Sequence, residues 1–586
     1  MRAAPLRSAR RAATAARRGR RGGCSGRCPG SSSGSATAAA RGPRVRRGAR
    51  RRRGPARARR PAGARLPPRG RAPRPRTTRQ GARRAPRPRP PPAFPPRVSD
   101  PPVERRPFPR GRGRGRGGAE RALSRRELLK ASAASAAALV AGAAPWASCA
   151  AAARRPNLLF LCSDQQHWQA VGSIDPFFDT PHCDALAKES VVFEAAFCTA
   201  PQCSPSRSSM LTGFYPHRTN VLGNAGPQGG YALGMGTLGG LLQAGGYHTA
   251  YFGKWHLGDD PRATAGWHES RLDAMDAETT EAGLRFLAEP DRARRPFALF
   301  LMYREPHPVY RFRPGRDEAA VRDVPLAASW HAETFAGKPP LLDEFMRREA
   351  GRVLFGRPER DWQAFRAFYR ERVRRFDDEV GRVLAALRSG GLWEDTVVVS
   401  TSDHGEMDTR HRLVFKGPFM YEHVIRIPAT IRLPARLGGP GPRRVKDALF
   451  VNVDFVPTLL DLAGLAPIDC HGRSARPLLT GEGEARPREY VIGQYHGNRD
   501  WFQPIRMIRT RELKWVRYRG HGEELYDLRE DPDELVNRAA DPAYAARRRE
   551  LEAELDAWIA RHGDPFHSLE PTPLRPARRT SGSDAA

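Results

Sequence analysis

Short apolar runs alternate with long amphipathic stretches from Pro156 onward, and this alternation limits the chain to few folds. Four of the runs cover residues 157–162, 248–252, 297–302 and 396–401, and each is bounded by turn residues. Runs of this length are typical of strands, whereas the stretches between them have the periodicity of helices. Strands that alternate with helices predict an α/β domain, with a central mixed sheet between layers of helices.

The longest predicted helix covers residues 364–387. Its apolar side chains recur at helical spacing, and Arg and Glu residues occupy the other face. Ser389-Gly390-Gly391 follows, and glycine commonly ends a helix. Within this helix we expect Asp377-Asp378 to be a solvated face with one buried cap rather than a catalytic pair.

Toward the C-terminus the pattern changes to short strand-like pieces, at residues 490–494, 506–509, 514–518 and 524–528. Turn residues separate them, and a helix with one apolar side follows over residues 544–559. We therefore expect a small antiparallel sheet with a helix appended to the main domain. The predicted order is a main domain over 154–480, the small sheet and helix over 481–565, and a disordered tail over 566–586.

The first 121 residues differ sharply from the rest. They contain 38 Arg, no Lys and three acidic residues, so they carry +35 of the formal charge of +37. About +2 is left for residues 122–586, which excludes a strongly basic globular domain. Because the segment has almost no aromatic or branched apolar side chains, it cannot bury enough surface to offset its ordering entropy, and we expect disorder.

Three interpretations of this Arg-rich segment stay open. It could bind RNA or another polyanion, as Arg-Gly runs such as residues 110–117 can. It could be a solvated spacer. Alternatively, translation could begin near Val103 or Leu123 of a GC-rich gene. The residues that follow favour this third interpretation, because they resemble an export signal, which belongs at the start of a chain.

Residues 122–150 have the parts of an export signal in the expected order. Ser124-Arg125-Arg126 opens a short basic region, an Ala-rich stretch follows over residues 131–144, and small residues lie at its exit. The twin arginine resembles the signal that the twin-arginine translocase reads. We expect export to the periplasm or the cell exterior. Lipid attachment at Cys149 is not favoured, because Trp146 stands where a small aliphatic residue is usual.

Two further functional classes are excluded by simple counts. No apolar run reaches about 18 residues, which excludes a polytopic membrane protein. The eight cysteines show no C-x-x-C spacing, so neither a disulfide scaffold nor a zinc knuckle is predicted.

Chemically active residues follow each of the four predicted strands. They are Ser163-Asp164-Gln165, Lys254-Trp255-His256, Arg304-Glu305-Pro306-His307 and Asp403-His404-Gly405-Glu406. In open α/β sheets ligands bind beyond the carboxyl ends of the strands, so we expect these groups at one edge. Taken singly, each Asp is more often a cap or turn residue. Together they predict a divalent cation flanked by groups for a bound anion.

A fifth segment places Cys203 at the start of a predicted helix. Pro205 is a residue type that favours the first turn, and a helix N-terminus favours anions. A buried or capping cysteine and a thiolate nucleophile of lowered pKa both remain possible. A phosphotyrosine phosphatase loop is excluded, because it needs Arg six positions after the cysteine and Ser209 stands there.

The run Cys203-Ser204-Pro205-Ser206-Arg207, continued by Ser-Ser-Met-Leu-Thr-Gly, resembles the signature of the formylglycine-dependent (type I) sulfatases of the alkaline phosphatase superfamily. The resemblance covers most of the chain after residue 154. The other matching segments are residues 155–160, 164–165, 180–184, 253–258, 306–308, 402–406, 416, 421–422, 454–458 and 524–528, with 531–532. It implies an alkaline-phosphatase-like fold and an exported enzyme that hydrolyses organic sulfate esters.

The resemblance also implies a modified nucleophile. In similar enzymes a separate formylglycine-generating enzyme reads Cys-x-Pro-x-Arg and oxidises the cysteine to Cα-formylglycine. One hydroxyl of the aldehyde hydrate attacks the sulfur of the ester, and the second hydroxyl then expels sulfate. Cys203 is the matching residue here. A thiol or a serine at this position has no second hydroxyl to release the sulfate.

A metal site is implied by the same resemblance. Asp164, Gln165, Asp403 and His404 match the positions that hold the cation, usually Ca²⁺ with Mg²⁺ as an alternative, together with an oxygen of residue 203. Gln165 stands where many relatives have a second Asp and offers a neutral oxygen, which Ca²⁺ sites tolerate. His404 replaces Asn, although imidazole is a less typical partner for a hard cation.

The remaining implied roles concern the sulfate and the leaving group. Arg207 matches the residue that orients the hydrate. Lys254, His256 and Lys416 match groups that neutralise sulfate oxygens, and His307 matches the proton donor to the leaving alcohol. We expect Glu406 to be structural.

Two other functions remain as alternatives. A phosphonate monoester or phosphodiester hydrolase can have the same fold, because sulfate and phosphate transition states share geometry. An Arg-rich nucleic-acid-binding protein is supported by the first 121 residues alone, so nucleic acid is not an expected partner. The substrate stays open between sulfated sugars and aryl sulfates, because the loops over 261–281 and 309–360 follow no motif.

Overall fold

The computed structural model describes residues 155–226, 230–317, 323–484, 487–498 and 501–574. The expected Arg-rich segment (1–121) and export signal (122–150) therefore lie outside the described residues and stay predictions. Within the described ranges, no helix combines the length and the apolar character needed to cross a bilayer.

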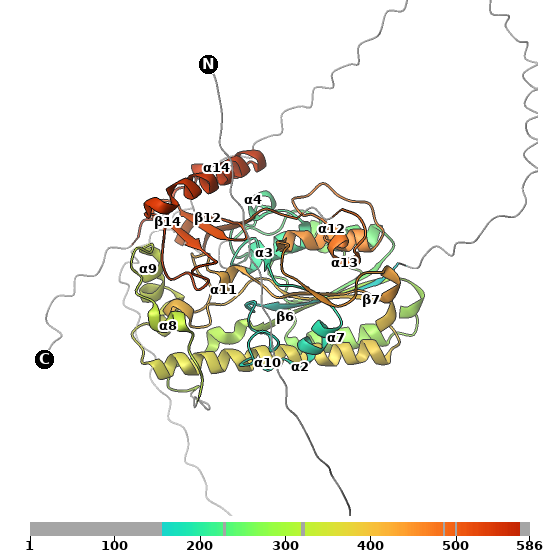
Figure 1. Ribbon diagram of the computed structural model, residues 1–586. Coiled ribbons are helices and arrows are strands. Elements are labelled where there is room, and N and C mark those ends of the chain that lie inside the picture. Colours follow the sequence, from blue (N-terminus) through green and yellow to red (C-terminus); the bar gives the residue numbers. More distant parts are fainter. Residues whose placement is uncertain (1–154, 227–229, 318–322, 485–486, 499–500, 575–586) are drawn as a thin grey trace, which may run out of the picture. The chain divides into compact units, whose positions relative to one another are not determined.

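Eight strands form one mixed sheet in the order β5-β4-β6-β1-β7-β8-β2-β9 (Figure 1). They are β1 (Asn157–Asp164), β2 (Val191–Phe193), β4 (His248–Gly253), β5 (Glu269–Leu272), β6 (Phe297–Pro306), β7 (Thr396–Ser402), β8 (Ala429–Arg432) and β9 (Arg443–Val445). The strands from β5 to β7 are parallel, whereas β8 is antiparallel to both neighbours. A separate parallel pair joins β3 (Ala196–Phe197) to β10 (Phe450–Val451). The predicted α/β class is confirmed.

The α-helices of the described chain range from one turn to eight. They are α2 (Pro181–Lys188), α3 (Cys203–Thr212), α4 (Pro216–Thr219), α5 (Leu238–Ala244), α6 (Pro261–Thr264), α7 (Asp276–Ala288), α8 (Ala328–Ala332), α9 (Leu341–Arg348), α10 (Glu359–Ser389), α11 (Glu422–Ile425), α12 (Phe455–Leu462), α13 (Arg476–Thr480) and α14 (Ala545–His562). Helices α2, α7 and α10 cover one face of the sheet, and α3, α12 and α13 lie on the other (Figure 1).

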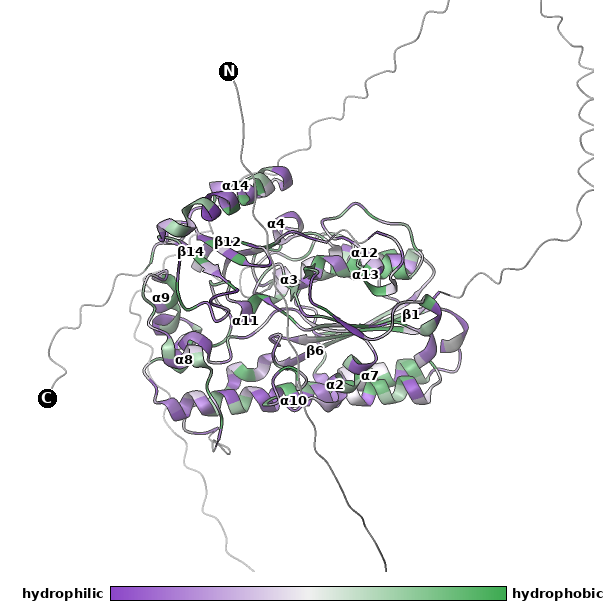
Figure 2. Cartoon of the chain, in the orientation of Figure 1, coloured by the Kyte–Doolittle hydropathy of each residue, from purple (hydrophilic) through white to green (hydrophobic). Residues whose placement is uncertain are grey.

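Alternate side chains of the central strands enter two separate hydrophobic layers, as the pleat of a strand requires. Leu159 of β1 packs among residues of α7 and α10. Its neighbour Phe160 points the other way, stacks on Phe300 of β6 at 5.0 Å and meets Phe455 of α12 edge-on at 5.2 Å. Figure 2 shows the hydrophobic strands between helices whose outer residues are hydrophilic.

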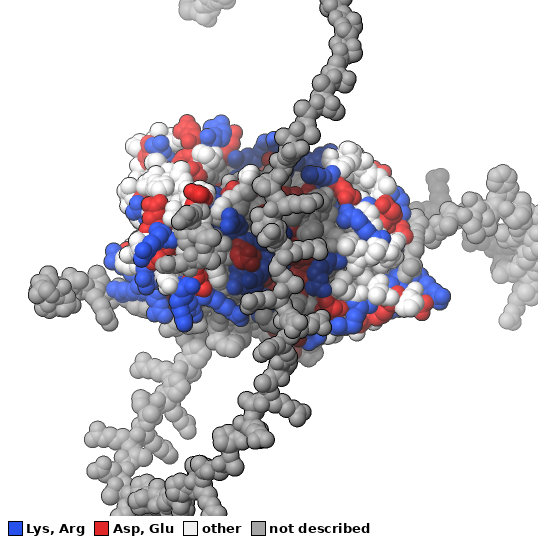
Figure 3. Space-filling view, turned by 90° about the horizontal axis from the view of Figure 1, so that it is seen from below, with Lys and Arg blue, Asp and Glu red and all other residues white. Residues whose placement is uncertain are grey.

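Helix α10 extends the predicted 364–387 by about one turn at its N-terminus. Its outward charges are paired, as in Arg374–Asp378 and Arg375–Glu371, and basic and acidic side chains are interspersed on the face seen in Figure 3. Asp377 is instead buried and accepts hydrogen bonds from the backbone N–H groups of the first turn of α2. The expectation of one solvated and one capping aspartate is confirmed.

A second, antiparallel sheet follows near the C-terminus. It consists of β11 (Val491–Asn498), β12 (Trp501–Arg509), β13 (Leu513–Tyr518) and β14 (Gly522–Asp527), in chain order, and α14 packs against β12 and β13. The expected small sheet with its helix is therefore present. The prediction of a loose tail from residue 566 is wrong up to residue 574: Phe566 is fully buried, and Gln503 donates to the Thr572 carbonyl at 2.8 Å.

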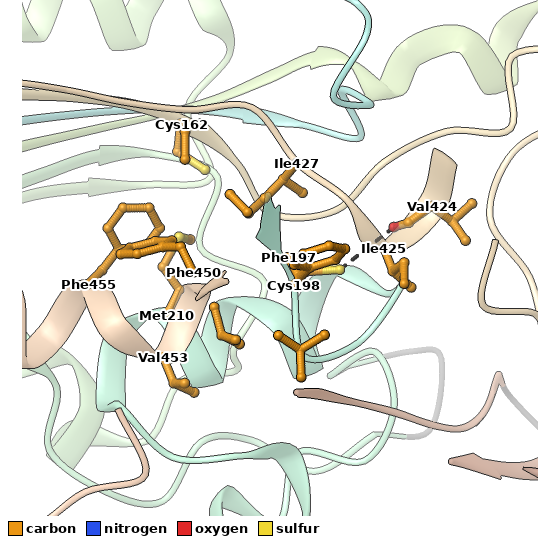
Figure 4. Packing of buried hydrophobic residues seen from close by; sticks show 14 of the residues in the cluster. Cys162, Phe197, Cys198, Met210, Val424, Ile425, Ile427, Phe450, Val453 and Phe455 are labelled. Atoms are coloured by element: carbon orange, nitrogen blue, oxygen red, sulfur yellow. Dashed lines mark hydrogen bonds between the residues drawn. The ribbon is translucent and has the colours of Figure 1, made fainter. Parts of the chain in front are cut away.

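The cysteines of the described chain are all free. Cys162 and Cys198 lie in the hydrophobic cluster between the main sheet and α3 (Figure 4), where the Cys198 thiol donates only a weak bond to the Val424 carbonyl. Burial raises the pKa of both thiols far above its usual value. These two residues are therefore packing side chains, in contrast to Cys203.

Candidate active site

The site is built around the first residue of α3. Gln202 is extended and Cys203 begins the helix, which ends at Gly213 in the left-handed conformation (φ 79°) that glycine adopts readily. All ten residues of α3 are buried. A buried helix N-terminus leaves unpaired N–H groups that favour negative charge, so Cys203 occupies an anion-binding position.

Two parallel strands bring acidic ligands to this helix end. Asp164 ends β1 and Asp403 follows β7, its neighbour in the sheet. One potential ligand atom from each of Asp164, Cys203, Asp403 and His404 lies within 4.8 Å of the others, and all four residues are buried. The predicted convergence at one edge of the sheet is thus observed for these residues.

His404 presents a lone pair to the cluster. Its Nδ1 lies 3.0 Å from the Gly405 carbonyl, which can only accept, so Nδ1 carries the proton. In the neutral ring Nε2 then has no proton, and it faces the Cys203 Sγ at 3.3 Å and the Lys416 Nζ at 3.0 Å. This tautomer is the one that a metal ligand requires.

Gln165 is held at the same edge by its backbone and its side chain. Its backbone is in the left-handed region (φ 74°), and its N–H donates to Asp403 at 3.0 Å. The amide nitrogen donates to Glu406 at 2.5 Å, and the amide oxygen accepts from Lys416 at 2.5 Å. Burial raises the pKa of Glu406 to about 8. Glu406 therefore holds the candidate ligand Gln165 in place, which agrees with the structural role expected for Glu406.

Lysines surround position 203 on the other side. Lys416 Nζ lies 3.0 Å and Lys254 Nζ 3.4 Å from Cys203 Sγ, and Lys254 also pairs with Asp164. Burial alone would raise the pKa of the Cys203 thiol, but the positive charges of Lys254 and Lys416 hold it well below its usual range. Any nucleophile at this position is stabilised as an anion.

Arg207 lies one turn into α3 and holds two other parts of the site in place. Its Nε donates to Asp403 at 2.8 Å and its NH1 to the Lys254 carbonyl at 2.9 Å. It thereby fixes one acidic side chain and the backbone that carries one lysine. The orienting role toward residue 203 implied by the resemblance stays a prediction.

The two predicted histidines also reach position 203. His256 contributes, after Lys254 and Lys416, to the lowered pKa of Cys203, and its buried Nδ1 has no partner among the described residues. His307 lies close enough to Lys254 and Cys203 to interact with both, and burial followed by the charge of Lys254 lowers its pKa. His307 is therefore neutral near pH 7.

The donor set fits a hard divalent cation. Asp164, Asp403 and Gln165 supply three side-chain oxygens, His404 supplies an unprotonated nitrogen, and an oxygen at position 203 would complete the group. Lys254, Lys416 and Arg207 offset the two carboxylates and an anion at position 203, so a bound cation would make the cluster positive. Such a centre is complementary to a bound anion.

Not every residue after a predicted strand joins the site. Arg304 bonds to Asp273, and Glu305 pairs with Arg372 at 3.0 Å. Conversely, several residues of the adjoining pocket have no motif in the sequence. They are Gln202, Tyr310, Arg348, Arg352, Tyr495 and Trp501. Of the two loops expected to shape the substrate pocket, 309–360 contributes to this lining and 261–281 does not.

Comparison with known proteins gives two overlapping family matches. The family model described as Sulfatase matches residues 156–465, and one described as N-sulphoglucosamine sulphohydrolase, C-terminal, matches residues 410–561. The chain is 29% identical over 466 residues to a Delta 4,5-hexuronate-2-O-sulfatase of Bacteroides thetaiotaomicron, covering 72% of this chain and 93% of the relative. It is 26% identical over 493 residues to an N-acetylglucosamine-6-O-sulfatase of the same organism, with coverages of 68% and 85%.

Solved structures show the same fold. A 2-O GAG sulfatase superposes with a TM-score of 0.64 at 27% identity, over 72% of this chain and 95% of that one. A phosphonate monoester hydrolase of Agrobacterium radiobacter superposes with a TM-score of 0.58 at 25% identity, over 72% and 100%.

Proposed function

The chain belongs to the type I sulfatase family and is a sulfuric ester hydrolase, and from that premise we propose that it hydrolyses carbohydrate sulfates through a formylglycine at position 203 and a bound divalent cation. The sugar part of the proposal is supported by the two relatives named for sulfated sugars. The mechanistic part is supported by the Cys203-x-Pro-x-Arg207 sequence at the buried start of α3.

One observation carries the mechanism. Four ligand atoms within 4.8 Å lie at a buried helix N-terminus, and the two lysines that meet the Cys203 Sγ belong to segments far apart in the chain. The sulfur stands at the position that a formylglycine oxygen would take. A site with this charge pattern binds a small tetrahedral anion next to a nucleophile.

A formylglycine at position 203 and a bound cation would supply two kinds of chemistry. Formylglycine hydrate would supply a nucleophilic hydroxyl together with a second hydroxyl that allows sulfate to leave. A cation held by Asp164, Gln165, Asp403 and His404 would act as a Lewis acid toward a sulfate oxygen.

The chain's own residues do the rest. Lys254 and Lys416 hold their ammonium groups where negative charge gathers on the sulfate oxygens, and they act strongly because the site is buried. His404 keeps its proton on Nδ1 and thus keeps Nε2 free. Arg207 fixes the candidate ligand Asp403 and the backbone that carries the Lys254 ammonium group, so both keep a set position in the site.

Departure of the alcohol requires a proton at the ester oxygen. His307 lies beside position 203 and also lines the adjoining pocket, so it sits between the reacting group and the remainder of a substrate. A neutral imidazole can hold a proton at one nitrogen and deliver it to the leaving oxygen. We assign His307 this role.

Export and activation are proposed from the sequence. The twin-arginine segment supports export through the twin-arginine translocase, and Cys-x-Pro-x-Arg supports a formylglycine-generating enzyme as a partner. Ca²⁺ is proposed over Mg²⁺ because the donors include a neutral amide oxygen and Ca²⁺ accepts flexible ligand sets, whereas Mg²⁺ demands near-ideal octahedral geometry.

The decisive experiment compares esters that differ in the reacting centre, with and without the cation. Purified enzyme is assayed with 4-nitrophenyl sulfate, 4-nitrophenyl phosphate and a phenylphosphonate ester, before and after chelation and after Ca²⁺ is restored. We expect the sulfate to be the best of the three and Ca²⁺ to restore activity. A sulfate rate far below both phosphorus esters would instead support a phosphonate monoester or phosphodiester hydrolase, the function named for one structural relative.

A further inference from the structure

A pocket of about 550 Å³ opens beside the reacting cluster. His307 and Lys416 form one end of it, so a substrate that places its ester at position 203 must extend into this space. Its volume lies in the range that holds a small organic ligand, such as a sugar ring or two. The residues of its outer wall therefore determine which sugar fits.

The outer wall is held rigidly against the lysine that meets the sulfate. Gly417 follows Lys416, and a Cβ there would come within 2.9 Å of the Phe345 ring, so α9 packs directly on this glycine. Phe345 also meets Phe419 edge-on at 5.2 Å. The turn after α9, a short 3-10 helix at Ala350–Val353, consequently presents its side chains to the pocket at a fixed position.

The end of α9 and this turn each place one arginine in the lining. Arg348 ends α9, is half-buried and lies 3.9 Å from Glu344. Arg352 is exposed, and no described residue pairs with its side chain. Glu349 lines the same wall. Two arginines and one glutamate thus line the wall in addition to Lys416, which the sulfate itself uses, and Arg352 is the arginine without an acidic partner among the described residues.

Two buried polar groups of the pocket, an acceptor and a donor, have no partner among the described residues. Gln202 is 4% exposed. Its amide nitrogen donates to the Gly497 carbonyl at 3.1 Å, while its Oε1 has no donor among the described residues. Trp501 is 5% exposed, and its indole N–H likewise has no acceptor there. A buried group without a partner is costly, and a sugar hydroxyl can satisfy either an acceptor or a donor.

We propose that this pocket binds a sugar with a second anionic group, a carboxylate or a further sulfate, and that Arg352 with Arg348 recognises that group. The proposal rests on the sulfatase function and names its substrate class. Gln202 and Trp501 bond to hydroxyls of the ring, Tyr495 offers an apolar wall, and the guanidinium groups meet the second charge with their planar forks. The enzyme thus discriminates against neutral sugars that carry one sulfate.

The test measures the activity of variants of the full chain on three groups of sugar substrates. The substrates are the positional isomers of a monosulfated uronic acid, their carboxyl-reduced counterparts, and disulfated neutral sugars. The variants are Arg352→Gln, Arg348→Gln and the control Arg347→Gln, which alters an exposed arginine of the same helix that pairs with Asp343. A charged hydrogen bond of 1.5–3 kcal/mol predicts a roughly 10- to 100-fold loss of kcat/KM for the dianionic substrate in the first two variants.

The same variants should lose much less activity with 4-nitrophenyl sulfate and with the neutral monosulfated sugar, because these substrates lack the second charge. If the acid and the disulfated sugar both lose activity, Arg352 recognises charge in general; loss with one alone identifies the group. Equal losses on neutral and dianionic sugars, or no preference by the wild type, would overturn the proposal.

Binding of the desulfated uronic acid, followed by calorimetry, separates this proposal from the sulfatase assignment. Arg352-dependent binding without hydrolysis of any sulfate ester would leave the pocket standing and remove the proposed reaction. Hydrolysis of nitrophenyl sulfate without Arg352-dependent binding of the acid would leave the sulfatase reaction standing and overturn the proposed role of the pocket.

Discussion

Glu406 accepts a hydrogen bond from the side-chain amide of Gln165 at 2.5 Å, although the two residues lie 241 positions apart in the chain. Because the Glu406 carboxyl group accepts from the amide nitrogen, the amide oxygen is turned toward Lys416 and the candidate cation site. Glu406 is buried and also accepts from the backbone of Phe415 and Asp408. A side chain outside the ligand set thus decides which atom Gln165 offers.

Glu406→Ala should weaken cation binding. Supporting partners of metal ligands typically contribute 10- to 100-fold in affinity, so we expect a loss of about tenfold. Glu406→Gln retains an acceptor oxygen and should stay within about threefold of the wild type. Equilibrium dialysis with Ca²⁺ measures both; equal affinities in the wild type and Glu406→Ala would contradict the positioning role.

Cys203→Ala should reduce the rate of sulfate release by more than about a thousandfold, as removal of a nucleophile generally does. Cys203→Ser keeps one hydroxyl and should release the alcohol once per enzyme without continued turnover. Mass spectrometry of the peptide that contains residue 203 provides the matching observation. An unmodified thiol in fully active enzyme would refute the proposed nucleophile.

Arg506→Met should destabilise the small sheet. Arg506 and Asp564 form a fully buried ion pair at 2.6 Å, and removal of one partner leaves an uncompensated charge that costs about 3–5 kcal/mol. Arg374→Met, which breaks the exposed pair with Asp378, should cost less than about 1 kcal/mol. Urea unfolding gives both free energies, and similar values for the two variants would count against this ranking.

Stability should fall as the pH drops below about 6.5. Burial lowers the pKa of His411 to about 4, so the unfolded chain binds a proton at this residue between pH 6.5 and 4 while the folded chain does not. The free energy of unfolding therefore falls by up to about 3 kcal/mol between pH 6.5 and pH 4 because of this residue. Its partner Glu333, 2.7 Å away, has a pKa lowered to about 2, because the His411 and Lys338 contacts outweigh the effect of burial, and extends the loss to lower pH.

His411→Gln should flatten the upper part of this profile. Urea unfolding of both proteins at pH 7.5, 5.5 and 4.5 measures the difference. The variant should be less stable than the wild type at pH 7.5 and the gap should narrow toward pH 4.5. A constant gap at all three values would show that His411 does not titrate as described.

Much of the fold could be predicted from local patterns. The apolar period of residues 364–387 predicts α10 because a helix repeats every 3.6 residues whatever surrounds it. Asp164 and Asp403 could be placed together because both follow runs that read as parallel strands, and such strands share an edge. Residues 566–574 were misjudged because nothing local signals that Phe566 is buried or that Thr572 joins β12.

The sequence alone therefore determined the α/β class, the start of α3 at Cys203, the carboxylates at the sheet edge and the family, since each depends on neighbours within a few residues or on an ordered set of motifs. Only the tertiary structure decided the orientation of the Gln165 amide, the bracing contacts of Arg207 and the union of Gln202, Arg352 and Trp501 in one pocket. These relationships join segments up to about 300 residues apart, as in the bond from Gln202 to Gly497. No local period encodes them, because they form only when the packing of both sheets brings those segments together.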